Sequence, residues 1–248
     1  MVLDLIELER SEPELLMSPR ETLSMYKSLV GSKGLTASVF LSYARRFEFF
    51  GMDDEAVGAY DETLVRDSLC GQAYLGRGEA LLGMFVARDD GGSASDLGRR
   101  AARDFERAVS LAGSARGQVF RSFATALLII GDYAKCENLV EAWFGQGHEQ
   151  ELDARSDLFY VLGFARLFSG YADTGIAAFF EMEKLGRSNE DSLFGRAMCF
   201  LMIRKMDRVR EIQCQLGPEL SEAVRILRES GCNSFLDVAR VLAMIGVG

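Results

Sequence analysis

Apolar residues recur at every third or fourth position along most of the chain, with polar residues between them. This spacing places the apolar side chains on one face of an α-helix, so it predicts a series of amphipathic helices. Only three prolines are present, and since an interior proline costs a helix about 3 kcal/mol, their scarcity also favours an all-α chain. Three stripes show the spacing well: Phe40, Tyr43, Ala44 and Phe47; Phe120, Phe123, Ala124 and Leu127; and Phe159, Leu162 and Gly163.

Each stripe is followed by a glycine and then by a second motif, which indicates an internal repeat. A small residue comes five positions after the glycine, and a bulky apolar residue comes nine positions after it. A stripe, a glycine and a second stripe describe two helices joined by a turn, so each unit is predicted to be a helix pair. The three sets are Gly51, Ala56 and Tyr60; Gly131, Cys136 and Val140; and Gly170, Gly175 and Phe179.

Two further units are less regular. In one of them, about eleven residues beyond a period of about 34 separate the two halves, which places an insertion near 86–97. The other has no small residue at the expected place in its second helix, which runs from Met206 to Cys214. The apolar positions of these units are Tyr74, Gly78, Leu81, Ala101, Phe105 and Ala108 in the first, and Phe194, Ala197, Met198 and Leu201 in the second.

These units resemble the tetratricopeptide repeat (TPR) family, whose repeats carry a small residue in the first helix, a glycine-acid-aromatic turn, and alanine then an aromatic in the second helix. The segment GDYAKCENLV from Gly131 is the most similar, and GMDDEAVGAY from Gly51 is also similar. The resemblance covers about Ala37 to Gly217 and implies an all-α, right-handed α-solenoid of about five helix pairs. The chain departs from the family in lacking the closing proline and in the residues that stand where tryptophan is expected: Phe40, Tyr74, Phe120, Phe159 and Phe194.

The two ends of the chain are predicted to cap this array with extra helices. We expect an N-terminal helical cap (1–35), a TPR-like array (36–217) and a C-terminal capping helix pair (218–248). Ser18-Pro19-Arg20-Glu21 is typical of a helix start, with Ser18 as N-cap, and the helix should end near Val30, before GSKG. Two last helices are expected over Glu219 to Arg228 and Phe235 to Ile245, covering the exposed core of the fifth pair.

Small residues within the stripes predict close helix contacts. Ala44, Gly78, Ala124 and Gly163 each lie in the first helix of a pair, at the place where neighbouring helices should approach most closely.

Charge and cysteine usage narrow the function classes. The net charge of −9 argues against a nucleic-acid binder and against docking on an anionic membrane surface. No uncharged run approaches the roughly 18 residues that span a bilayer, so we expect no direct membrane insertion. The start MVLDLIELER does not match a secretory signal, which favours a cytoplasmic protein, although a removed leader or lipid anchor would leave no trace.

Five scattered cysteines without a C-x-x-C pair predict reduced thiols, with neither disulfides nor a zinc site.

Candidate catalytic groups are few. His148 is the single histidine, and its neighbours Glu149 and Glu151 are compatible with a base or a metal ligand, but an exposed loop is the favoured interpretation. Asp89 to Ser95 lacks the alternating acids of a calcium loop and is expected to be an exposed, mobile loop.

Phosphate-loop, dinucleotide and nucleophile-elbow motifs are absent from the sequence. The short basic faces that include Arg99 and Arg208 are interpreted as solvated helix surfaces. We therefore expect neither an enzyme nor a cofactor or metal.

The family resemblance implies that ligands bind the inner surface formed by the first helix of each pair. The lysines and asparagines that clamp chaperone C-termini in some TPR proteins are not matched here, because Leu41, Arg45, Leu75 and Glu79 stand at those places. The alternative is that the inner side chains are core residues. The predicted groove residues, mostly apolar, are Leu41, Arg45, Phe49, Leu75, Glu79, Arg121, Leu128, Ile129, Tyr160, Phe164, Phe168, Cys199, Met202 and Ile203.

Two functions follow from these alternatives. The first is a non-enzymatic protein–protein interaction module, such as a scaffold, adaptor or chaperone-like protein, which binds an apolar peptide or helix of a partner protein in this groove. The second is a structural subunit of a homo-oligomer or larger complex, whose groove is filled by its own helices.

Overall fold

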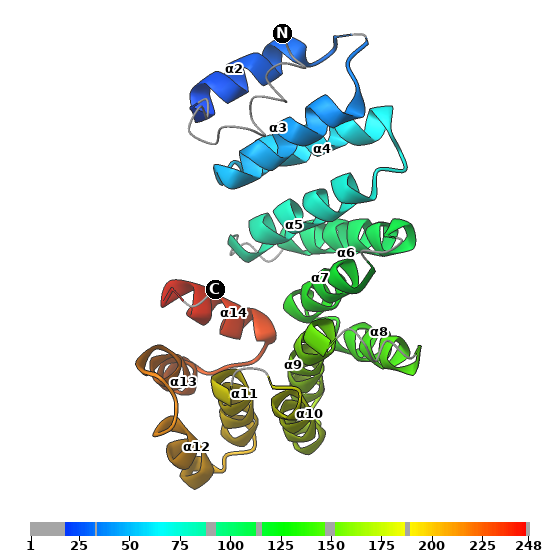
Figure 1. Cartoon of the computed structure of the whole chain (residues 1–248). Helices are drawn as coiled ribbons and strands as arrows, with labels where there is room; N and C mark the ends of the chain where they lie inside the picture. The colour runs from blue at the N-terminus through cyan, green and yellow to red at the C-terminus, as the bar shows by residue number, and fades with distance from the viewer. Residues whose placement is uncertain are drawn as a thin grey trace. The chain divides into compact units, whose positions relative to one another are not determined.

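The computed structural model describes residues 18–32, 34–87, 93–112, 116–146, 152–186 and 189–246, and within these ranges every regular element is an α-helix (Figure 1). The predicted all-α fold is therefore confirmed. The helices are α2 (Pro19–Leu29), α3 (Ala37–Phe49), α4 (Asp53–Arg66), α5 (Gly71–Ala87), α6 (Ser93–Leu111), α7 (Arg116–Ile130), α8 (Tyr133–Gly145), α9 (Leu152–Phe168), α10 (Ala172–Lys184), α11 (Asn189–Met202), α12 (Met206–Gln213), α13 (Pro218–Ser230) and α14 (Phe235–Met244).

The chain divides into two compact units, Met1–Val119 and Phe120–Gly248, which we call unit 1 and unit 2. In unit 1, α3 packs on α4, α4 on α5 and α5 on α6, while α2 adds Tyr26 to the core of the first pair. The Tyr26 ring meets the Phe47 ring edge-on, with 5.3 Å between centroids. Helix α2 begins as predicted, because Ser18 and Glu21 form a complete capping box.

Unit 2 contains most of α7 and the helices from α8 to α14. Helix α9 packs on α8 and α10, and α11 packs on α10, α12 and α13. Its core is rich in aromatic rings: Trp143, Phe164, Phe179 and Phe194 are all buried. The predicted final helices are present as α13 and α14, but α14 does not simply cover the last pair. Its first residue, Phe235, packs on Phe164 of α9.

The repeat glycines occupy the turns as the sequence predicts. Gly51, Gly131 and Gly170 all have positive φ angles, of 67°, 90° and 92°. In each turn the following backbone N–H donates to a carbonyl five residues back, as Asp132 does to Leu127 at 3.0 Å. The turn between α11 and α12 has the same bonding from Lys205 to Phe200, with Arg204 in place of glycine at φ 59°.

Close helix contacts occur at glycines, two of which were predicted. A Cβ added at Gly163 would lie 2.6 Å from the Phe179 ring, and one at Gly78 would lie 3.2 Å from Phe105. The Phe179 ring also lies against Gly195, where an added Cβ would come within 2.3 Å. These rings fill the space between neighbouring helices that a larger residue at the glycine would occupy.

Part of the predicted insertion is helical. Helix α5 extends to Ala87 and α6 begins at Ser93, so the expectation of a loop through Ser95 is wrong for its last three residues. Residues 88–92 lie outside the described residues, as do 147–151, which include His148.

Candidate functional site

Among the residues that the structure describes, two cavities coincide with predicted groove residues, one within each unit. Within the described residues no cluster of histidine, cysteine or acidic side chains could hold a metal ion. No helix in the described ranges combines the length and apolar character needed to cross a membrane. These two cavities are the candidate sites considered for function.

The cavity of unit 1 has a volume of about 420 Å³ and a lining of mixed polar and apolar residues. Arg45 of α3 donates a hydrogen bond from Nη2 to Oε1 of Gln72 on α5, at 2.9 Å. The buried Tyr60 hydroxyl donates to Oε2 of Glu48 at 2.7 Å. Burial raises the pKa of Glu48, while the Tyr60 hydrogen bond opposes this shift. Of the predicted residues, Arg45, Leu75 and Glu79 line this cavity.

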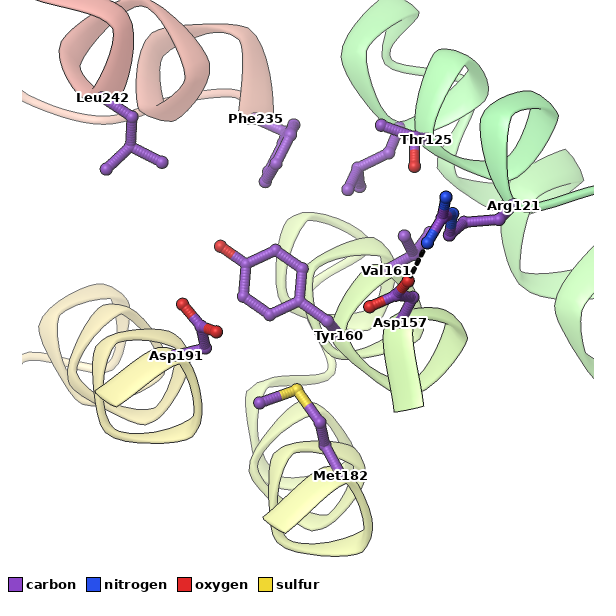
Figure 2. A pocket seen from close by; sticks show the side chains of 10 residues that line it. Arg121, Thr125, Asp157, Tyr160, Val161, Met182, Asp191, Phe235 and Leu242 are labelled. Carbon is purple, nitrogen blue, oxygen red and sulfur yellow. Dashed lines mark hydrogen bonds and ion pairs between the residues drawn. The ribbon is translucent and has the colours of Figure 1, made fainter. Parts of the chain in front are cut away.

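The cavity of unit 2 is larger, about 460 Å³, and more apolar (Figure 2). Its walls come from α7, α9 and α11, the first helices of three predicted pairs, with Met182 from α10, and α14 covers it. We call the face formed by α7, α9 and α11 the inner face of unit 2. The lining residues are Arg121, Thr125, Leu128, Asp157, Tyr160, Val161, Met182, Asp191, Phe235 and Leu242.

Helix α14 is held over this face by its first turn. The Phe235 ring lies 4.9 Å from the Phe164 ring, centroid to centroid, and the Phe235 backbone N–H donates to the Tyr133 hydroxyl at 3.1 Å. A capping box between Ser234 and Asp237 fixes the start of the helix. Because α14 spans the cavity rather than filling it, space remains beneath Phe235 and Leu242 (Figure 2).

Charged groups lie on two sides of Tyr160, as Figure 2 shows. Asp157 pairs with Arg121 and is largely buried, with 12% of its side chain exposed. Asp191 of α11 lines the opposite side. Burial raises the pKa of the Tyr160 hydroxyl, and the nearby Asp191 charge raises it further, so this hydroxyl stays protonated at neutral pH.

The structure corrects part of the predicted groove. Phe164, Leu128 and Cys199 have no exposed surface in this conformation, so Phe164 and Cys199 are core residues, and Leu128 is a core residue that also borders the cavity. Phe164 is covered because the Phe179, Phe194 and Phe235 rings surround it.

The other predicted residues keep at least some exposed surface. Tyr160, Arg121, Ile129 and Phe168 are half-buried in unit 2, and Leu41 packs partly against the core of unit 1. Met202 and Ile203, at the end of α11, are 39% and 37% exposed, whereas Phe49 is 73% exposed.

Sequence reasoning missed several lining residues. Asp157 lies one helical turn before Tyr160, so extending the α9 face by one turn would have found it. Asp191 and Met182 lie on neighbouring helices at positions that the repeat pattern did not single out. Phe235 and Leu242 belong to a helix whose existence was predicted but whose packing partner had no local signal.

Comparison with known proteins shows which solved structures have a similar fold. No family model matches the sequence, and no curated protein matches it. Among solved structures, YrrB, described as a TPR protein with an unusual peptide-binding site, is similar with a TM-score of 0.52 and 16% identity, over 86% of this chain and 95% of that chain. A tetratricopeptide repeat protein from Parabacteroides merdae is similar with a TM-score of 0.56 and 13% identity, and the match covers 99% of this chain and 83% of that chain. PilF from Pseudomonas aeruginosa is similar with a TM-score of 0.56 and 13% identity, and the match covers 85% of this chain and 89% of that chain.

The chain has the TPR fold. The repeat pattern of the sequence, the paired helices and the structural similarity all agree on this point. At identities of 13–16% the similarity establishes the fold alone, and function has to be argued from the site. Within this TPR fold, the inner face of unit 2 is the more apolar of the two candidate sites.

Proposed function

We propose that the protein is a non-enzymatic interaction module that binds an apolar peptide or helix of a partner protein on the inner face of unit 2. The observation that carries the proposal is the cavity of about 460 Å³, which has apolar walls and a few polar groups. Ligand sites in proteins commonly have this combination, since apolar walls supply affinity and sparse polar groups fix orientation. YrrB, which is described as having an unusual peptide-binding site, supports peptide binding by a protein of similar fold.

The cavity shares Tyr160 with the groove that the sequence predicts. Tyr160 is half-buried and keeps exposed surface in the cavity, whereas Phe164 is fully buried, and Val161 and Met182 in the cavity wall are 3% and 1% exposed. Tyrosine is well suited to anchor a partner, because it offers a large apolar ring with one polar end and few rotatable bonds. A segment that buries about 500 Å² of apolar surface gains about 12 kcal/mol before association costs of about 4–15 kcal/mol. Binding at about micromolar affinity or weaker is expected, and it should be reversible.

Selected peptides test the proposal directly. A displayed library of random peptides about 12 residues long is selected against the full chain, and the affinities of the best peptides are measured by fluorescence anisotropy. Tyr160→Ala should weaken them about tenfold or more, as expected for the loss of an anchor residue. The matched control is Tyr171→Ala, since Tyr171 is 63% exposed and does not line the cavity. Failure to select any peptide, or equal losses in both variants, would contradict the proposal.

The second candidate is a structural subunit with a self-filled groove, and one observation favours it. Phe235 of α14 already covers Phe164, the residue that the sequence assigned to the groove. Sedimentation over a range of concentrations separates the two functions. A mass that rises with concentration, together with no peptide binding, would favour the subunit.

A further inference from the structure

Helix α14 limits what the inner face of unit 2 can bind. Phe235 and Leu242 project from α14 into the cavity, while the other lining residues come from α7, α9, α10 and α11 (Figure 2). A helix with its side chains is about 10–12 Å wide and rises about 1.5 Å per residue. A bound helix as long as α14, which has 10 residues, therefore needs far more room than the 460 Å³ beneath α14. With α14 in place, the cavity admits side chains but not a whole helix.

The face that α14 turns toward the cavity has the pattern of a helical ligand. Phe235 and Val238 are buried, with 6% and 0% of their surface exposed, and Leu242 lines the cavity. These positions are i, i+3 and i+7, which share one face of a helix. Amphipathic helices that bind apolar grooves use the same spacing for their anchor residues. Helix α14 therefore occupies the inner face of unit 2 as a partner helix would.

The contacts beneath the first turn of α14 form a site for an aromatic helix start. The Phe235 ring lies 4.9 Å from the Phe164 ring and 6.5 Å from the Phe168 ring, centroid to centroid. The Phe235 N–H is one of the donors at a helix N-terminus that find no acceptor within the helix, and it donates to the Tyr133 hydroxyl at 3.1 Å. Departure of α14 would uncover this hydroxyl and the sides of the two rings that face Phe235.

The attachment of α14 permits such a departure. Residues 231–234 connect α13 to α14 without regular structure, and Gly231 has a φ of 81°. Among the described residues of α14, Phe235 and Val238 are the buried ones. A helix that is joined by a short irregular connection and buries two side chains can leave its site while the helices beneath it remain folded.

We propose that α14 is an intramolecular competitor for the partner segment on the inner face of unit 2. The partner segment is an amphipathic helix that carries an aromatic residue in its first turn and apolar residues three and seven positions later. It takes the place of α14, and α14 in its docked position lowers the apparent affinity of the free protein. This inference rests on the proposed function, and it specifies the conformation of the bound segment and the regulation of the site.

The effect on affinity depends on the fraction of molecules in which the site is open. When only that fraction binds, the apparent dissociation constant is the intrinsic constant divided by the open fraction. A substitution that weakens the docking of α14 therefore tightens the binding of a partner. The opposite sign is expected if α14 is a wall of the site, since the substitution then removes a ligand contact.

Phe235→Ala in the full chain separates these two cases. We expect the peptides selected in the experiment above to bind this variant about tenfold more tightly than wild type, as measured by fluorescence anisotropy. Met244→Ala is the matched control, because Met244 lies on the same helix and is 66% exposed. It should leave the affinity unchanged. Unchanged or weaker binding by Phe235→Ala would overturn the competition.

Hydrogen exchange of the wild-type chain tests the displacement without any substitution. Saturation with a selected peptide should slow exchange in α9 and accelerate exchange in α14, because the bound peptide excludes α14 from the inner face. Slower exchange in both helices would show that the peptide lies beneath a docked α14, and it would overturn the competition.

A synthetic peptide with residues 233–246 tests the chemistry of the partner helix. It contains Phe235, Val238 and Leu242, so it should displace the selected peptides from the full-chain Phe235→Ala variant. The same synthetic peptide with Phe235→Ala should bind at least about tenfold more weakly, as expected for the loss of an anchor residue. Absence of binding by the unaltered synthetic peptide would overturn the helical partner.

The outcomes distinguish this inference from the function on which it rests. Selected peptides that require Tyr160 but bind Phe235→Ala no more tightly than wild type would overturn the competition and leave the proposed function in place. Failure to select any peptide that requires Tyr160 would overturn both proposals. If α14 of a second copy is the occupant, the mass of the full chain rises with concentration and the synthetic peptide dissociates the oligomer. That result would overturn a helix of another protein as the occupant.

Discussion

At the scale of single residues, the turn between α11 and α12 contains a conformation that its side chain disfavours. Arg204 has a φ of 59°, whereas glycine provides the positive φ at the equivalent turns that begin at Gly51, Gly131 and Gly170. A residue with a Cβ pays about 1–2 kcal/mol in this left-handed region, because the Cβ crowds the carbonyl oxygen. The exposed Arg204 side chain therefore lies at a locally strained position.

Arg204→Gly should therefore stabilise unit 2 by about 0.5–1 kcal/mol. The relief of backbone strain exceeds the extra flexibility that glycine gives to the unfolded chain. Urea unfolding of the full chain, followed by circular dichroism, measures the change.

A neighbouring residue provides the control for this substitution. Lys205→Gly removes the same charge one position later, where φ is −84° and no strain is relieved, so it should destabilise the protein by up to about 1 kcal/mol. Equal effects of the two substitutions would show that charge, rather than backbone conformation, controls stability at this turn.

At the scale of helices, α14 is attached by a small buried surface. Phe235 and Val238 are its buried residues, with 6% and 0% of their surface exposed, and the rest of the described helix is half-buried or exposed. Segments with few buried contacts open more readily than the core of a protein. We therefore expect α14 to open locally while the helices beneath it remain folded.

Phe235→Ala should increase hydrogen exchange in α14 at least tenfold, because it removes the ring that packs on Phe164. Exchange in the middle of α9 should change much less. Hydrogen-exchange mass spectrometry of the full chain measures both segments at once.

Met244→Ala is the control for this experiment, because Met244 belongs to the same helix and is 66% exposed. It should leave the exchange of α14 nearly unchanged. If Phe235→Ala increased exchange throughout unit 2, α14 would be part of the cooperative core and not a local cover.

Helix positions were predictable from the sequence, but the packing of α14 was not. Turn glycines, the Ser18 capping box and the close contact at Gly163 depend on residue types near one another in sequence or on the repeat itself. The hydrogen bond from Phe235 to Tyr133 joins residues 102 positions apart, and nothing in the helical pattern specifies such a pairing. For this reason Phe164, one turn after Tyr160, was assigned to the groove, although the Phe179, Phe194 and Phe235 rings bury it.

At the scale of the whole molecule, the chain consists of two compact units rather than one core. The Phe47 ring packs with Tyr26 and Tyr43 in unit 1, and the Phe179 ring packs with Tyr160 and Phe164 in unit 2. In repeat proteins each repeat contacts mainly its neighbours, so stability is approximately a sum of local terms. Loss of a core ring should therefore affect one unit more than the other.

Phe47→Ala and Phe179→Ala test this expectation as a matched pair. Both rings are fully buried, and each substitution should cost about 3–5 kcal/mol locally by removing the ring and leaving a cavity. Hydrogen exchange should accelerate in α3 and α4 for Phe47→Ala, and in α9 to α11 for Phe179→Ala, with much smaller changes in the other unit. Equal acceleration in both units by either substitution would show that the chain unfolds as a single cooperative block. If the expected result is found, a ligand on the inner face of unit 2 should protect α7, α9 and α11 from exchange while leaving α3 and α4 unchanged, since binding stabilises the segments that it contacts.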